Sequence, residues 1–171
     1  TIHASADASL LTQFHIGGEG KLIVEGLAVG DRIGSGPVRL VRDSSELETV
    51  GQGDILVATA TTPDWEPAMK RSAAIITEHG GRTCHAAIVA RELGIPVIVG
   101  AANARQLLKE GQEATVDCSQ GMTGRVLEGL VPFSVQTIDI GKLEKPDIDL
   151  MVNIANPGAA FRVAALPVAG V

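Results

Sequence analysis

Short apolar runs, each bounded by glycine, proline or polar residues, recur between residues 20 and 131. Runs of this length that are rich in valine and isoleucine are typical of β-strands. The stretch 26–36 is instead punctuated by glycines without the spacing of a nucleotide-binding loop, so it is predicted to be a series of turns. The pattern predicts strands at 21–25, 37–42, 55–60, 73–77, 97–99, 113–117 and 124–128.

Three segments carry the start and stop signals of helices. Two of them are short, at residues 63–71 and 104–110. The third follows a double glycine, with Thr83 at the predicted N-cap, His85 in the first turn and Gly94 at the end. This third helix is apolar on one side, which predicts that it packs against a sheet.

Composition and regularity divide the chain into four segments. Residues 20–131 hold enough strands and apolar side chains for one core, and they are predicted to be a single α/β domain. Residues 1–19 and 132–148 are predicted linkers, and a strand and helix at 149–171 predict the first unit of a larger domain. Because the chain begins with Thr1 rather than Met, we expect an internal piece of a longer protein.

The net charge of −6, without a basic cluster or an aromatic platform, argues against nucleic acid as a partner. No apolar run reaches the roughly 18 residues of a membrane-spanning helix, and nothing at the start resembles a signal peptide. We therefore expect a cytoplasmic protein. Cys84 and Cys118 lack metal-binding or redox spacing, so they are expected to be free thiols, and no metal site is predicted in this chain.

His85 is the candidate for chemistry. A glycine turn lets the backbone approach a ligand closely, and a helix N-terminus presents N–H groups to an anion. Imidazole, with an ordinary pKa of about 6.5, is a nucleophile that can carry a phosphoryl group covalently. The alternative is a structural histidine that packs beside Ile88 and Val89, and position alone leaves both interpretations open.

Cys84 directly precedes His85, which raises the alternative of a cysteine–histidine nucleophile. Neighbouring residues on a helix do not face each other, so the two side chains cannot readily share a proton. No third, orienting group is evident in the sequence. We interpret Cys84 as a small residue that fills space.

The run from Gly80 to Gly100, GGRTCHAAIVARELGIPVIVG, resembles the phosphohistidine signature of the PEP-utilising enzymes. Residues 21–41, 62–77 and 150–171 also resemble that family, so the likeness covers most of the chain. Within the family, the Thr-Cys-His order and residues 62–77 most resemble the phosphoenolpyruvate synthases. Pyruvate phosphate dikinase and enzyme I of the sugar phosphotransferase system are the alternatives.

The resemblance implies a swivelling β/β/α domain that carries a phosphoryl group on His85, followed by the start of a C-terminal (β/α)8 barrel. It implies that Thr83 is phosphorylated by a regulatory kinase and dephosphorylated by a phosphorylase. It also implies phosphate contacts from Gly80, Gly81 and Arg82.

For the parent enzyme, the resemblance implies that an ATP-grasp domain loads the histidine and that the barrel unloads it onto pyruvate. ATP and Mg²⁺ would bind mainly outside this chain, and the products would be AMP, phosphoenolpyruvate and phosphate. The parent is expected to be a homodimer, and this chain alone is expected to be inactive in full turnover. From a different class, a stand-alone phosphocarrier whose reading frame ends near Val131 stays open, as does the ring nitrogen that is modified.

Overall fold

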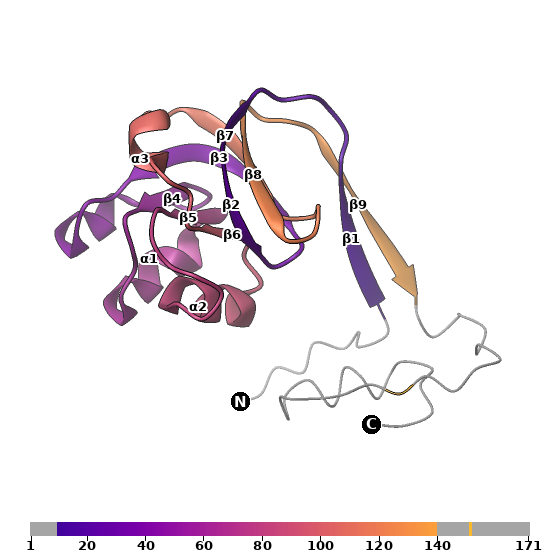
Figure 1. Ribbon diagram of the computed structural model, residues 1–171, viewed down its shortest axis with the longest axis horizontal. Coiled ribbons are helices and arrows are strands. Elements are labelled where there is room, and N and C mark those ends of the chain that lie inside the picture. Colours follow the sequence, from indigo (N-terminus) through magenta and orange to yellow (C-terminus); the bar gives the residue numbers. More distant parts are fainter. Residues whose placement is uncertain (1–9, 140–150, 152–171) are drawn as a thin grey trace. The chain divides into compact units, whose positions relative to one another are not determined.

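The computed structural model describes residues 10–139 and Met151 (Figure 1). The chain divides into two compact units, one of residues 14–134 and one formed by residues 1–13 together with 135–171. The candidate site lies wholly in the first unit. The expected barrel segment at 149–171 lies outside the described residues except for Met151, and it stays a prediction.

Seven strands of the first unit close into a barrel in the order β2-β6-β5-β4-β3-β7-β8. Strands β3, β4, β5 and β6 run parallel to one another, and the other pairs are antiparallel. The mixed α/β class is confirmed, whereas the sheet layers that we expected take the form of a closed barrel. The strands are β2 (Leu22–Val29), β3 (Ile33–Leu40), β4 (Ile55–Ala58), β5 (Ala74–Thr77), β6 (Val97–Val99), β7 (Glu113–Asp117) and β8 (Thr123–Glu128).

Two apolar clusters lie on opposite faces of the barrel wall. The inner cluster takes residues from all seven strands, and α3 (Ala104–Leu107) contributes Ala104 to it. The outer cluster joins the other faces of β4, β5 and β6 to α1 (Glu66–Arg71) and α2 (His85–Leu93). Figure 1 shows α1 and α2 on one side of these strands and α3 on the other. Burial on both faces explains why these strands are continuous apolar runs.

Short 3-10 helices complete the connections. They are η1 (Ser44–Thr49), which follows β3, and η2 (Pro63–Trp65), which leads directly into α1. The helix expected at 63–71 is thus a 3-10 turn followed by a short α-helix. The helix expected at 104–110 ends earlier, at Leu107.

The stretch 26–36 is not a series of turns, which corrects our expectation. It holds the second half of β2 and the start of β3. A side chain at Gly34 would collide with the backbone oxygen of Ala73, and one at Gly36 with that of Gly53. These glycines therefore let neighbouring backbone pass close to β3. In the sequence alone, a glycine with this role looks the same as one in a turn.

Two strands pair outside the barrel, β1 (Leu10–Ile16) and β9 (Phe133–Asp139). The backbone N–H of Gly17 donates to the oxygen of Pro132 at 2.8 Å, and the rings of Phe14 and Phe133 pack with centroids 6.2 Å apart. These residues lie in segments predicted to be irregular linkers, so regular pairing is a correction at the level of local structure. The domain boundaries themselves stay predictions.

In the part of the chain that the structure describes, no helix is both long and apolar enough to cross a bilayer.

Candidate functional site

His85 opens helix α2, directly after the turn that follows β5. The N-cap residue is Cys84, with extended backbone angles of φ −70° and ψ 165° and no side-chain capping bond. Thr83, which we predicted to be the N-cap, lies one residue earlier, so that expectation was wrong. The first N–H groups of a helix have no intrahelical partners, which makes the start of α2 favourable for an anion.

The turn before α2 requires glycine at one position. Gly80 has φ +121°, and a Cβ at this residue would lie 2.9 Å from the Sγ atom of Cys84. Gly81 has no atom within 4 Å of such a position, and its oxygen accepts the backbone N–H of Cys84 at 3.0 Å. Gly80 therefore sets the path of the chain, and the turn delivers His85 to the helix start.

Thr61 holds the ring of His85. Its Oγ1 lies 3.1 Å from Nδ1 of the histidine, and Thr61 itself is buried. When Nδ1 carries the ring proton, it donates to Thr61, and the lone pair of Nε2 is left available. No partner of Nε2 is found among residues 10–139. The ring is half-buried, with Nδ1 beside Thr61 and, in the Nδ1–H tautomer, a free lone pair on Nε2.

Sequence reasoning missed Thr61, although it lies beside the segment that carries the family likeness. The signal that could have found it is topological. Strands β4 and β5 are parallel, and Ala58 pairs with Thr77. The residues that follow these strands, including Thr61 and His85, therefore lie at the carboxyl end of the parallel strands. Ligands commonly bind at this end of such sheets.

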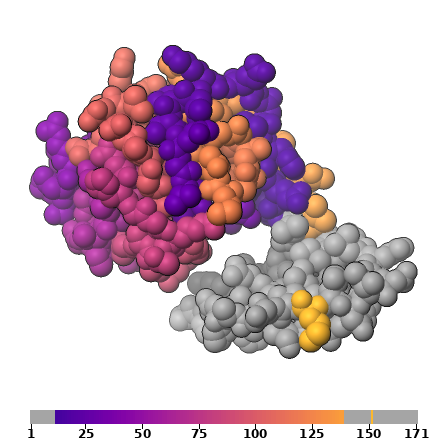
Figure 2. Space-filling model, viewed as in Figure 1, coloured from indigo at the N-terminus to yellow at the C-terminus, as the bar shows by residue number. Residues whose placement is uncertain are grey.

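Arg82 and Thr83 are exposed on the turn before α2. Arg82 is tied to the helix through its backbone oxygen, which accepts Nη1 of Arg91 at 2.9 Å. Figure 2 shows the magenta atoms of the middle of the chain gathered on one side of the folded unit. The guanidinium of Arg82 and the hydroxyl of Thr83 are both accessible from solvent, so each could meet a phosphoryl group or a second protein.

Glu66, at the start of α1, places negative charge near the histidine. Its Oε1 lies 2.6 Å from Nζ of Lys70. Lys70, above all, holds the pKa of the Glu66 carboxyl below its usual value, and charge on His85 adds a smaller effect in the same direction. Glu66 thus places a carboxylate close enough to His85 for their charges to interact, although solvent screens the pair.

Both cysteines are free thiols, as expected. Cys84 is half-buried at the start of α2, whereas Cys118 is buried beside β6 and its Sγ lies 3.5 Å from the oxygen of Val97. Burial raises the pKa of the Cys118 thiol to about 12. No group of three or more histidine, cysteine or carboxylate side chains suited to a metal ion is found within the described ranges.

Residues 50–121 match the family model described as PEP-utilising enzyme, mobile domain. This range runs from the residues before β4 to the turn between β7 and β8. It therefore includes Thr61, the glycine turn, His85 and the whole of α2.

The matching curated relatives include several phosphoenolpyruvate synthases. The enzyme of Pseudomonas aeruginosa (strain UCBPP-PA14) is 47% identical over all of this chain and 22% of its own length. That of Deinococcus radiodurans is 50% identical over 94% of this chain and 21% of its own length. That of Escherichia coli (strain K12) is 46% identical over 95% of this chain and 20% of its own length. The chain thus spans about a fifth of these relatives.

Among solved structures, the NMR solution structure of Enzyme I (nEIt) protein is 33% identical, with a TM-score of 0.40. The match covers 46% of this chain and 33% of that chain.

Proposed function

This chain belongs to the family of PEP-utilising enzymes, and on that premise we propose that it is the phosphoryl-carrying domain of a phosphoenolpyruvate synthase. The observation that carries the proposal is the setting of His85. Its Nδ1 lies beside Oγ1 of Thr61, and the residue stands at the start of α2, directly after a glycine turn. This arrangement suits a histidine that is loaded and unloaded repeatedly without losing its orientation.

In the proposed step, the lone pair of Nε2 forms a bond to phosphorus while the bond from phosphorus to the leaving oxygen breaks. The ring proton stays on Nδ1, where it donates to Oγ1 of Thr61. The ring then carries a positive charge, which the phosphoryl oxygens and nearby Glu66 offset. The N–H groups at the start of α2, together with Gly80, Gly81 and Arg82, are the proposed phosphate contacts.

The other parts of the reaction belong to the remainder of the polypeptide. We propose an ATP-grasp domain that loads His85 and a (β/α)8 barrel, beginning near residue 149, that unloads it onto pyruvate. Supporting this, the relatives are about five times longer than the chain. ATP and Mg²⁺ would bind mainly in those domains, where Mg²⁺ supplies charge stabilisation for the transferring phosphoryl group. The chain alone would then be labelled but would not produce phosphoenolpyruvate continuously.

Thr83 is the proposed site of regulation. It is exposed and lies two residues before His85. A phosphate on Thr83 would bring a charge of about −1.5 to −2 close to the incoming phosphoryl group. Repulsion between the two would slow loading of the histidine, so a kinase and a phosphorylase acting on Thr83 could switch the enzyme.

The direct test is phosphorylation of the full-length parent enzyme by ³²P-labelled phosphoenolpyruvate and Mg²⁺. We expect a phosphoprotein that is labile in acid and stable in base. The substitution His85→Ala should abolish the label. His79→Ala is the matched control, because His79 is an exposed histidine of the same loop and should leave labelling unchanged. Full labelling of the His85→Ala enzyme would overturn the assignment.

A further inference from the structure

A cavity of about 440 Å³ lies around the carboxyl end of β3 and the helices η1 and α3. Its size is that of a site for a small molecule. Three arginines and two glutamates line it, and His85 does not. The lining residues are Arg39, Leu40, Arg42, Glu46, Thr49, Arg105 and Glu110.

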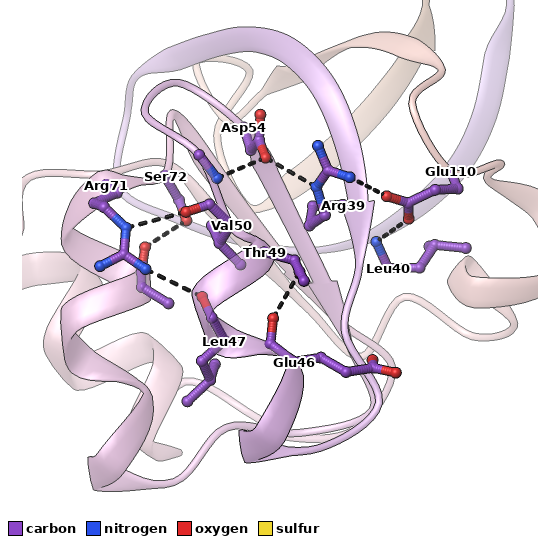
Figure 3. A network of polar contacts seen from close by, with 12 residues as sticks. Arg39, Leu40, Glu46, Leu47, Thr49, Val50, Asp54, Arg71, Ser72 and Glu110 are labelled. Atoms are coloured by element: carbon purple, nitrogen blue, oxygen red, sulfur yellow. Dashed lines mark hydrogen bonds and ion pairs between the residues drawn. The ribbon is translucent and has the colours of Figure 1, made fainter.

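Both carboxylates of the lining are already engaged within the protein. Figure 3 shows Arg39 held between Asp54 and Glu110. The second oxygen of Glu110 accepts the backbone N–H of Leu40 at 2.8 Å. Glu46 accepts the backbone N–H of Arg42 at the same distance. The carboxylates thus shape the wall of the cavity and order Arg39 rather than await a cation.

Two guanidinium groups of the lining have donors to spare. Among the described residues, no carboxylate oxygen lies within 4.0 Å of the side-chain nitrogens of Arg42 or Arg105. Arg105 donates from Nη1 to Oγ1 of Thr59 at 2.8 Å, but its Nε is buried and has no partner in the described part of the chain. A buried donor without a partner costs free energy, so the hydrogen bonding of Arg105 is incomplete within the described residues.

We propose that this cavity binds a small molecule through a phosphate or carboxylate group, with Arg42 and Arg105 as its ligands. Guanidinium groups present paired N–H donors that match these oxyanions in geometry and charge. A cation is disfavoured because arginine has no acceptor and both lining carboxylates are engaged. The cavity is separate in space from the proposed phosphoryl-carrying residue, since His85 is not among its lining residues.

Arg105 also connects the cavity to the segments that hold His85. Its backbone N–H donates to Oε1 of Glu78 at 3.1 Å, and its side chain bonds Thr59. Thr59 lies two residues before Thr61, and Glu78 begins the loop that leads to His85. An anion bound to Arg105 would therefore affect the positions of Thr59 and Glu78 through these hydrogen bonds.

The test is an NMR titration of the ¹⁵N-labelled chain with inorganic phosphate and, separately, with malonate at constant ionic strength. We expect saturable shifts of the Nε–H signals of Arg42 and Arg105. Saturation by phosphate alone identifies a phosphorylated ligand, and saturation by malonate alone identifies a carboxylate ligand. Shifts that grow linearly with both anions would overturn the proposal.

Three variants with the same change of charge make the test specific. Arg42→Gln and Arg105→Gln should each weaken binding about tenfold, the loss expected for a charge-assisted hydrogen bond. Arg32→Gln is the control, because Arg32 is exposed and does not line the cavity. The amide spectrum of each variant shows whether the fold is kept, and equal affinity in all three would refute the site.

Discussion

At the scale of single residues, the contact between Thr61 and Nδ1 of His85 links the orientation of the ring to its tautomer. A hydroxyl at Nδ1 can serve either tautomer, but only donation from Nδ1–H leaves Nε2 nucleophilic. The contact is therefore an orienting device for the proposed carrier histidine. Its importance can be tested without disturbing the core, since threonine and valine have almost the same shape.

Thr61→Val should slow phosphorylation of the parent enzyme about three- to tenfold, which corresponds to the net worth of one hydrogen bond. Thr61→Ser should restore most of the rate. The ¹⁵N shifts of the His85 ring provide a second measurement, because the valine variant should lose its preference for the Nδ1–H tautomer. An unchanged tautomer in the valine variant would contradict the orienting role.

Thr83 should tolerate the loss of its hydroxyl, because it is exposed and does not cap α2. We expect Thr83→Val to change the free energy of unfolding by less than about 0.5 kcal/mol. Thr83→Asp should slow loading of His85 far more than Thr83→Val does, because it adds negative charge beside the incoming phosphoryl group. Rates of label transfer in the parent enzyme measure both effects, and equal rates for the two variants would remove the electrostatic explanation.

At the scale of elements, the junction between β5 and α2 depends on a backbone conformation that few residues adopt. Gly80→Ala should destabilise the chain by about 1–3 kcal/mol, because φ is positive and the new methyl group meets Sγ of Cys84. Gly81→Ala is the matched control, since open space surrounds its Cβ position. Urea unfolding of the two variants measures the difference, and equal stability would show that the turn relaxes without cost.

Elements with strong local signals could be predicted from the sequence. The bounds of β6 and β7 are confirmed, as is the end of α2 at Gly94, where φ is +66°, whereas α2 starts one residue later than we predicted. The second half of β2 and the start of β3 were missed because their glycines serve close backbone contacts. Local sequence does not distinguish such a glycine from one in a turn.

The candidate site was predicted in part. His85 and the glycine turn stand in one continuous stretch, and a family likeness pointed to them. Thr61 was not found, because it reaches His85 only through the parallel pairing of β4 and β5. The cavity at Arg42 and Arg105 combines segments more than sixty residues apart, so no local sequence pattern predicts it.

At the scale of the folded unit, Cys84 can be modified in the native protein, whereas modification of Cys118 measures opening of the barrel. Cys84 is half-exposed, whereas Cys118 is 1% exposed and has its thiol pKa raised to about 12 by burial. Iodoacetamide at pH 8 should modify Cys84 in the native protein and should leave Cys118 unmodified. Cys118 should react at the rate at which the barrel opens, so urea should accelerate its modification in step with unfolding.

Mass spectrometry after timed quenching separates the two sites. Cys84→Ser is the control that leaves Cys118 as the remaining thiol of the chain. Rapid modification of Cys118 under native conditions would show that the barrel opens locally beside β6. The raised pKa also predicts that the contribution of this thiol to stability is complete at neutral pH. That contribution is lost as the pH rises from about 9 towards 12, because only the unfolded chain loses the proton there.

The closed barrel of seven strands matters for the proposed movement of this domain between docking sites. An open sheet keeps a border of unpaired peptide groups, which invites strands of other molecules to attach. In this ring each strand already has a neighbour on both sides, so leaving a docking partner exposes no such border. The proposed carrier has to leave one docking site and bind another in every cycle, and a barrel without open edges suits that movement. Undocking would then cost only the free energy of the docking contacts, and no strand of the barrel would lose a hydrogen-bonded neighbour.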